Sequence, residues 1–256
     1  QRIERGLGRP LFERTRSGYL ATDLASQLAG HAEQLESALE AARGCVESAP
    51  AQISGSVRIT TSEVAAVWLL PGVLAELAAA EPGIQIELLA SNALDNLLRR
   101  EADIAVRMVR PLQASLVARK LAELPIVAAA HADYLARAGT PRSPAELPQH
   151  RLIGYDRDET IVRGFAALGL SLTREQFALR TDDQVAYGRL VAAGAGIGFV
   201  AAYNIAHWPG VQPLLPMLKI PPLPCWLAVH REIRGSRVVR RVYDFLAEAI
   251  PRALAR

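Results

Sequence analysis

The chain has 256 residues, 50% of them apolar and 21% charged, with a formal net charge of +3. This composition is ordinary for a globular protein, and the length suggests about two domains. It excludes a membrane span, because no apolar run approaches the ~20 residues that a span requires. The polar start at Gln1 has neither an initiator methionine nor an apolar signal segment. We therefore expect a cytoplasmic chain that begins inside a longer sequence.

The excess positive charge lies entirely in the first 20 residues. That segment holds five arginines against two glutamates, whereas the remaining residues hold equal numbers of basic and acidic side chains. Such asymmetry favours a short nucleic-acid-facing segment attached to an electrically balanced body. A solvated basic chain end is the plainer alternative, which charge alone leaves open.

The first 55 residues predict a helix, a hairpin and a second, longer helix. Residues 1–6 are helical in pattern and end at a glycine-rich turn, and residues 11–19 indicate a small hairpin with its turn near Ser17-Gly18. Thr22 is the expected N-cap of a helix that runs to about Glu47, along which apolar residues recur every seven positions at Leu28, Leu35 and Ala42. The turn-rich residues 48–55 are the expected domain boundary.

After this boundary the pattern changes to alternating strands and helices. Strands are predicted at 57–61, 84–89, 103–107, 152–155, 177–180, 197–201 and 226–230, with one long extended stretch at 116–130. Helices are predicted at 65–80, 92–100, 133–138, 158–168, 183–193, 202–207 and 236–249. This rhythm predicts a largely parallel sheet with helices on its faces, whose ligands bind beyond the carboxyl ends of the strands.

Residues 2–14, Arg-Ile-Glu-Arg-Gly-Leu-Gly-Arg-Pro-Leu-Phe-Glu-Arg, resemble the signature of LysR-type transcriptional regulators at the end of the recognition helix and the start of the wing. Residues 14–19 resemble the rest of the wing, and the long helix after them resembles the family's linker helix. Further blocks match in the family's order: Gly55–Ile59, Leu70-Pro71, Glu81–Ile84, Asp103–Arg107, Ser115–Arg119 and Leu190–Gly198. Most of the family's helix-turn-helix is absent, and Ala21–Ala25 and Met108–Arg110 depart from its pattern.

The resemblance implies an α/β effector-binding domain of two subdomains, similar to type 2 periplasmic binding proteins. Residues 1–22 would be the end of a recognition helix and the wing of a winged helix-turn-helix, and residues 23–47 a linker and dimerisation helix. Residues 55–256 would be the effector domain, with subdomain I at 55–127 and 222–256 and subdomain II at 128–221. An effector bound between the subdomains would alter the geometry of the oligomer and so control transcription.

The partners implied by the resemblance are promoter DNA in the intact protein, a small-molecule effector, RNA polymerase and further copies of the chain. A homodimer or homotetramer would use the linker helix and the helices at 65–80 and 236–249. We expect no membrane partner, no cofactor besides the effector, and no enzymatic activity. Two other readings of the same α/β body stay open: a solute-binding protein of a transporter and, less favoured, a small-molecule enzyme.

The expected DNA contacts of the basic segment are arginines: Arg2, Arg5, Arg14 and Arg16. Arginines in a wing suit phosphate or minor-groove contacts. Because most of the reading helix is missing, we expect residues 1–256 on their own not to bind DNA sequence-specifically. A mobility shift with a specific promoter fragment at moderate salt would refute this expectation.

The family's effector lies at strand ends and helix starts. Positions here that match are Thr61, Ser62, Ser91, Asn92 and Arg107 on one side and His131, Thr181 and Asp182 on the other. Hydroxyls and N–H groups at helix starts suit a carboxylate or other anion, to which Arg107 would add a charge-assisted hydrogen bond. Simple N-capping is the alternative role of each hydroxyl, and Asp182 and Glu63 would repel an anion.

Motifs for catalysis or metal binding are absent from the sequence. Cys45 and Cys225 lie far apart, the histidines lack ligand spacing, and no serine lies in a nucleophile elbow. The glycines of Gly194–Gly198 follow a predicted helix and precede a predicted strand, the reverse of the order in a dinucleotide-binding loop, so they indicate a tight turn. Asp182-Asp183 opens a predicted helix, where carboxylates cap N–H groups.

Overall fold

The computed structural model describes residues 2–15, 18–29, 31–32, 35, 39, 53–92, 102–113, 115–167, 169–170, 172–231 and 236–255. The chain forms two compact units, Gln1–Gly55 and Ser56–Arg256. All of the predicted helix at 92–100 except Asn92, and most of the predicted helix up to Glu47, lie outside the described residues, as does Arg16.

The N-terminal unit contains a short helix followed by a hairpin, as predicted. Helix α1 (Arg2–Leu7) ends at Gly8, whose φ of 65° is readily adopted by glycine. Strands β1 (Phe12–Thr15) and β2 (Gly18–Ala21) pair antiparallel, with Thr15 opposite Gly18. The hydroxyl of Thr22 accepts a hydrogen bond of 3.2 Å from the Ala25 N–H, which confirms Thr22 as a helix N-cap.

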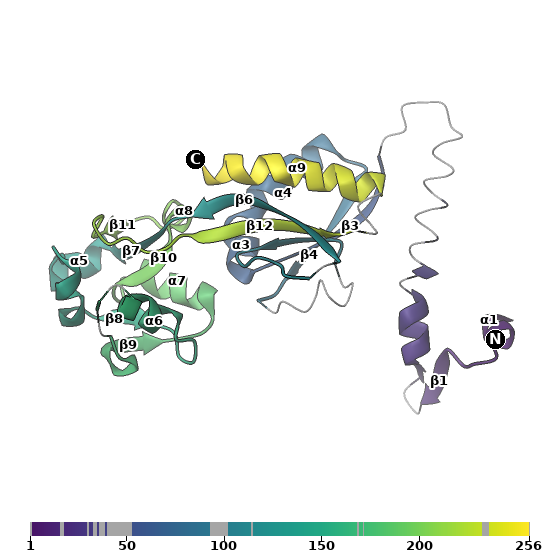
Figure 1. The fold of residues 1–256 in the computed structure, drawn as a ribbon, viewed down its shortest axis with the longest axis horizontal. Helices are drawn as coiled ribbons and strands as arrows, with labels where there is room; N and C mark the ends of the chain where they lie inside the picture. The colour runs from purple at the N-terminus through teal and green to yellow at the C-terminus, as the bar shows by residue number, and fades with distance from the viewer. Residues whose placement is uncertain are drawn as a thin grey trace. The chain divides into compact units, whose positions relative to one another are not determined.

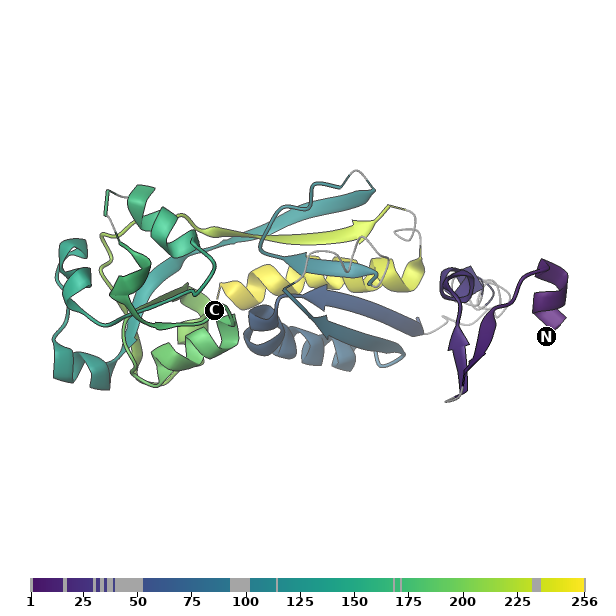
Figure 2. The same ribbon diagram turned by 90° about the horizontal axis from the view of Figure 1, so that it is seen from below.

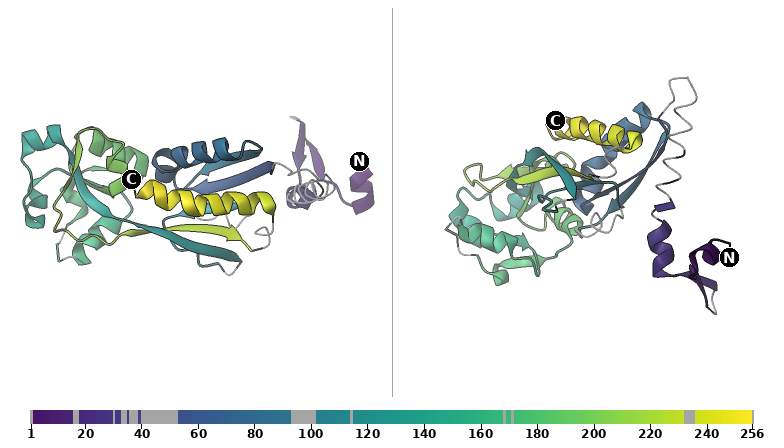
Figure 3. Two further views of the ribbon diagram at one scale, coloured as in Figure 1. Left: turned by 90° about the horizontal axis from the view of Figure 1, so that it is seen from above. Right: turned by 45° about the vertical axis from the view of Figure 1, so that its right-hand side comes forward.

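The second unit has two lobes, of which the first is built on a five-stranded sheet in the order β4-β3-β5-β12-β6 (Figure 1). The strands are β3 (Gly55–Thr61), β4 (Ile84–Ala90), β5 (Ile104–Arg107), β6 (Leu116–Leu124) and β12 (Leu223–His230). Helix α3 (Glu63–Trp68) follows β3, and α4 (Leu70–Ala80) lies beside the C-terminal α9 (Arg237–Leu254), which packs on β6 and β12 (Figure 3). Fully buried Ile59, Leu77, Ile104, Leu227 and Leu246 belong to the core of this lobe.

The second lobe contains a three-stranded sheet in the order β10-β7-β11 and a parallel pair β8-β9. Its strands are β7 (Ile126–His131), β8 (Leu152–Gly154), β9 (Phe177–Arg180), β10 (Gly198–Ala201) and β11 (Val211–Leu214). Its helices are α5 (Ala132–Ala138), α6 (Thr160–Ala167), α7 (Gln184–Ala192) and α8 (Ala202–Ile205), with short 3-10 turns η1 (Pro144–Gln149) and η2 (Arg174–Gln176). A parallel bridge between Leu152 and Ile197 joins the two sets of strands.

Two chain connections link the lobes. The first is Pro125, between β6 and β7, and the second is residues 215–222, between β11 and β12. Figure 2 shows β6 and β12 running side by side along the first lobe towards these connections. Each lobe therefore folds around its own sheet, and the polypeptide passes between them twice.

Three predictions of secondary structure need correction. The single helix at 65–80 is two helices, because Pro71 lacks the N–H that would continue α3 into α4. The extended stretch at 116–130 is two strands in different sheets, divided at Pro125. The sheets are mixed rather than largely parallel, because β12 is antiparallel to β5 and β6, and β7 is antiparallel to β10 and β11.

Candidate functional site

The ends of β3 and β5 and the residue after β4 lie side by side in the first lobe. Thr61 is fully buried, and its hydroxyl donates a hydrogen bond of 3.0 Å to the carbonyl oxygen of Val106. The Ser91 N–H donates to the Thr61 carbonyl oxygen at 2.9 Å. The structure thus brings together the predicted site residues of this lobe, but the Thr61 hydroxyl is used within the sheet.

Arg107 connects these strand ends from inside the lobe. Its guanidinium donates to the Thr60 hydroxyl at 2.8 Å and to the Ser91 carbonyl oxygen, and the residue is only 6% exposed. Burial lowers the pKa of the guanidinium, which stays protonated at neutral pH. Arg107 is therefore placed to hold the site in shape, and the predicted direct contact with an effector has no support from its geometry.

Ser62 and Asn92 surround the start of α3. Ser62 is the N-cap, its hydroxyl accepting from the Ala65 N–H at 3.4 Å. The Asn92 side chain accepts from the Glu63 N–H at 3.2 Å and donates to the Glu63 carboxylate at 3.0 Å. The Glu63 and Ala65 N–H groups at the start of α3 thus already have partners within the protein.

Thr181 and Asp182 occupy the corresponding place in the second lobe, after β9. The Thr181 N–H donates to the Gly154 carbonyl oxygen at 3.1 Å, and its hydroxyl accepts from the Asp183 N–H at 3.2 Å. Asp183 is the N-cap of α7, accepting from Val185 and Ala186 at 2.9 and 2.8 Å. The capping role predicted for the acidic pair is therefore confirmed for Asp183.

Asp182 holds the loop that follows β8. Its carboxylate accepts hydrogen bonds from the N–H groups of Arg157 at 3.0 Å, Asp158 at 3.3 Å and Asp156 at 2.9 Å. These donors, that of Arg157 first, keep the pKa of the carboxyl below its usual range. The Asp182 carboxylate therefore stabilises the backbone conformation of the loop at 156–158.

We expect Asp182→Asn to destabilise the protein at neutral pH, because the ionised carboxylate accepts more strongly than an amide. A folded pKa below the unfolded value near 3.8 means that this stabilisation is complete above 3.8 and is lost as the pH falls through the folded pKa. Urea unfolding midpoints measured against pH check this. The difference in unfolding midpoint between the wild type and the variant should become smaller below pH 3.8. Asp244→Asn, at an exposed position of α9, is the control, and an equal difference in midpoint at every pH for Asp182→Asn would contradict the prediction.

The two groups of site residues precede helices of different lobes. The helices that follow them, α3 and α7, pack against each other (Figure 1). Ser62 opens the first of these helices, and Thr181 lies just before the second. The arrangement sets two half-buried hydroxyls at the carboxyl ends of strands from opposite lobes, where α/β proteins bind ligands.

His131 does not belong to this group. It ends β7 opposite Val211, whereas the other end of β7, Ile126, pairs with Ala201 beside the first connection. Its ring accepts from the Asp133 N–H at 3.1 Å, and a Cβ at Gly210 would come within 2.3 Å of it. His131 as an effector ligand stays a prediction, and its position at the far end of β7 from the first connection does not add support to it.

Tyr155 is a residue of this edge that sequence reasoning missed. It follows β8, its ring centroid lies 5.1 Å from that of Tyr187, and it packs on the second lobe's core. Burial, followed by the charges of Asp158 and Asp182, raises the pKa of its hydroxyl to about 12. Its position as the last residue of the predicted strand at 152–155 was the available signal, since predicted site residues such as Thr61 and Arg107 also end predicted strands.

The glycine-rich segment Gly194–Gly198 is a tight turn, as predicted. Gly194 has a φ of 71°, and a Cβ at Gly196 would lie 2.4 Å from the Arg151 carbonyl oxygen. A Cβ at Gly198 would lie 2.4 Å from the Val191 side chain. These glycines allow close approach between backbone segments and leave no room for a phosphate.

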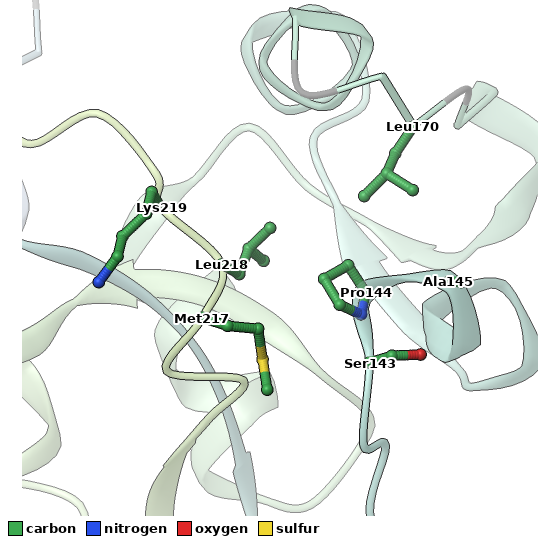
Figure 4. A pocket seen from close by; sticks show the side chains of 7 residues that line it. All are labelled: Ser143, Pro144, Ala145, Leu170, Met217, Leu218 and Lys219. Atoms are coloured by element: carbon green, nitrogen blue, oxygen red, sulfur yellow. The ribbon is translucent and has the colours of Figure 1, made fainter.

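A separate pocket of about 440 Å³ lies in the second lobe (Figure 4). Its lining is mainly apolar and comes from the start of η1, the segment after α6 and the second connection: Ser143, Pro144, Ala145, Leu170, Met217, Leu218 and Lys219. The Lys219 side chain points away from it in Figure 4. The lining contains no residue predicted to bind the effector.

Of the arginines predicted to contact DNA, Arg5 is exposed on α1. Arg2 lies at the start of α1 and Arg14 in the hairpin strand β1. Their role on DNA stays a prediction. Within the described part of the chain, no helix is long and apolar enough to span a membrane, and no group of three or more acidic, histidine or cysteine side chains gathers as a metal site.

Comparison with known sequences finds one family over most of the chain. The LysR substrate binding domain matches residues 50–251. The HTH-type transcriptional regulator PtxR of Pseudomonas aeruginosa is 30% identical over 213 residues, which are 81% of this chain and 67% of that protein. The HTH-type transcriptional activator AaeR of Escherichia coli is 29% identical over 205 residues, covering 76% and 66%. The matched part thus spans about two thirds of these curated relatives.

Solved structures share the fold. The regulatory domain of CrgA from Neisseria meningitidis matches with a TM-score of 0.67 at 24% identity, covering 77% of this chain and 100% of that chain. The CrgA structure that includes more of the protein matches with a TM-score of 0.68 at 22% identity, covering 100% and 87%. The predicted α/β effector domain of two subdomains is therefore confirmed as the fold class.

Proposed function

Because this chain belongs to the LysR family of transcriptional regulators, we propose that its two lobes bind a small effector between them and thereby control transcription. The lobes would be the subdomains expected at 55–127 with 222–256 and at 128–221. The observation that carries the proposal is the packing of α3 against α7, because each of these helices follows a polar strand end of its own lobe. A ligand touching both edges would favour one arrangement of the lobes over another.

The hydroxyls of Ser62 and Thr181 are the proposed contacts. Each accepts a hydrogen bond from its own helix turn, and among the described residues neither donates one. A hydroxyl carries one proton to donate, so both suit an acceptor oxygen on the ligand. We propose a small carboxylate or carbonyl compound as the effector.

The N-termini of α3 and α7 are expected to contribute less to effector binding than the sequence suggests. At the start of α3, the Glu63 N–H already donates to Asn92 and the Ala65 N–H to Ser62. At the start of α7, the Val185 and Ala186 N–H groups already donate to Asp183. Glu63 and Asp182 add negative charge nearby. The proposed ligand is therefore held by hydroxyls rather than by helix dipoles.

The remaining roles are proposed from family membership. The intact protein would bind promoter DNA, act with RNA polymerase in the cytoplasm, and have no enzymatic activity. A homodimer or homotetramer is supported by the exposed apolar side chains of Leu35 and Leu39, four residues apart in the N-terminal unit. Light scattering that gives only monomer at micromolar concentration would count against this assembly.

A thermal-shift screen tests the proposed effector site. Small carboxylates, amino acids, neutral carbonyl compounds and aromatics are tested against the 256-residue chain. A true effector should raise the Tm of the wild type, and Ser62→Ala and Thr181→Val should each reduce that rise. Ser236→Ala, which removes the N-cap of distant α9, is the matched control and should leave the rise unchanged. Equal rises in all variants would contradict the proposed site.

A further inference from the structure

Helix α3 belongs to the first lobe, but its last side chain lies in the second. The Trp68 ring lies 5.4 Å from the His207 ring and 5.9 Å from the Trp208 ring, which it meets edge-on at 89°. It packs against the core cluster that contains Tyr187, Val191 and Trp208. An indole from one lobe thus completes the hydrophobic core of the other.

The surface that receives Trp68 is held firmly. We call it the Trp68 seat and define it as His207 and Trp208. Trp208 lies directly over Gly188 of α7, where a Cβ would come within 2.7 Å of its ring. Because α7 also starts next to Thr181 and Asp182, the seat is fixed to the same helix as the proposed effector site of the second lobe.

The N-terminal end of α3 lies at the proposed effector site of the first lobe. Ser62 caps the helix at one end and Trp68 closes it at the other. Helix α3 ends at its C-cap, Leu69, and α4 begins directly after it with Pro71 in its first turn. Ser62 and Trp68 therefore lie at opposite ends of one short helix.

Unsatisfied polar atoms lie in the Trp68 seat and in α8, which precedes it in the sequence. Asn204 and Trp208 are buried, and among the described residues the Asn204 Oδ1 and the Trp208 Nε1 have no hydrogen-bond partner. Buried polar groups without partners are costly. The packing around the Trp68 seat therefore carries a free-energy cost.

We propose that Trp68 is a positioning residue that holds the two lobes in this arrangement. Departure of its ring from the Trp68 seat is the step that releases them, and an effector acts by shifting α3. The regulatory part of this statement rests on the proposed function, whereas the contact between the lobes does not.

Distance measurement between spin labels on the two lobes tests the role of Trp68 without any ligand. Labels are placed at Ala79→Cys on α4 and Ala166→Cys on α6, both exposed positions, in a Cys45→Ser background that retains the fully buried Cys225. The chain with Trp68 intact should give one narrow distance distribution. Trp68→Ala should broaden it and add a second population, and Trp68→Phe should broaden it less.

Two further variants keep the test decisive. Val67→Ala changes an exposed neighbour on the same helix and should leave the distribution narrow. His207→Ala removes the exposed side of the Trp68 seat and should broaden it even if Trp68→Ala fails to fold. Unchanged distributions in Trp68→Ala or His207→Ala, or equal broadening in Val67→Ala, would overturn the proposal. Failure of the effector screen would leave these results unaffected.

Discussion

Replacing Arg107 by alanine is expected to lower the free energy of unfolding by about 3 kcal/mol, because two hydrogen bonds from a buried charged donor are lost. The Thr60 hydroxyl and the Ser91 carbonyl oxygen would lose their guanidinium partner at the ends of β3 and β4. Urea denaturation monitored by circular dichroism measures the change. Arg107→Lys should recover only part of it, since an ammonium lacks the planar fork that reaches both acceptors.

Arg110→Ala is the matched control for Arg107→Ala. Arg110 is exposed, and its guanidinium lies 5.4 Å from the Trp226 ring, a contact expected to contribute less than about 1 kcal/mol. An Arg107→Ala variant as stable as Arg110→Ala would show that the strand ends do not depend on the guanidinium. It would also reopen a direct effector contact as the role of Arg107.

Replacing Gly196 by alanine is expected to destabilise the protein by about 3 kcal/mol or to prevent folding of the second lobe. The new Cβ would lie 2.4 Å from the Arg151 carbonyl oxygen and 3.2 Å from its carbon, and backbone cannot yield as a side chain can. That carbonyl accepts from the Ile197 N–H at 2.9 Å, and Ile197 in turn accepts from the Ile153 N–H at 2.9 Å. The clash would therefore separate β8 from the strand that continues into β10.

Gly164→Ala provides the contrast for Gly196→Ala in thermal unfolding. Gly164 lies within α6, and a Cβ there meets no atom within 4 Å. Alanine should stabilise this helix by about 0.5–1 kcal/mol through its higher helix propensity and smaller loss of backbone entropy. Equal Tm values for the two variants would show that the turn at Gly194–Gly198 has more room than the structure indicates.

Local chemistry explains why much of the fold could be predicted from the sequence. Thr22, Ser62 and Asp183 are N-caps at predicted helix starts, because a short polar side chain before an apolar repeat satisfies the first N–H groups. The order of helix, glycines and strand predicted the turn at Gly194–Gly198. These features depend on neighbours a few residues apart, and so they can be inferred from a single sequence.

The features that the sequence did not predict depend on distant partners. Arg107 points inward because Thr60 and Ser91, from other segments, accept its hydrogen bonds. The sequence predicts one extended stretch at 116–130 that ends beside His131, whereas Pro125 divides it and β7 leads away from the first connection. The contact of Trp68 with the Trp68 seat joins residues about 140 positions apart in the sequence, and no periodic pattern predicts such a contact.

Calorimetric titration tests the central claim that an effector binds between the lobes through Ser62 and Thr181. A compound that stabilises the wild type in the thermal-shift screen is titrated into wild type, Ser62→Ala, Thr181→Val and the double variant. Loss of both hydrogen bonds should weaken binding about 100-fold, at about 1–1.5 kcal/mol for each bond. Ala145→Trp, which fills the pocket in Figure 4, should leave the Kd unchanged. Unchanged affinity in the double variant, or loss of binding in Ala145→Trp, would contradict the account.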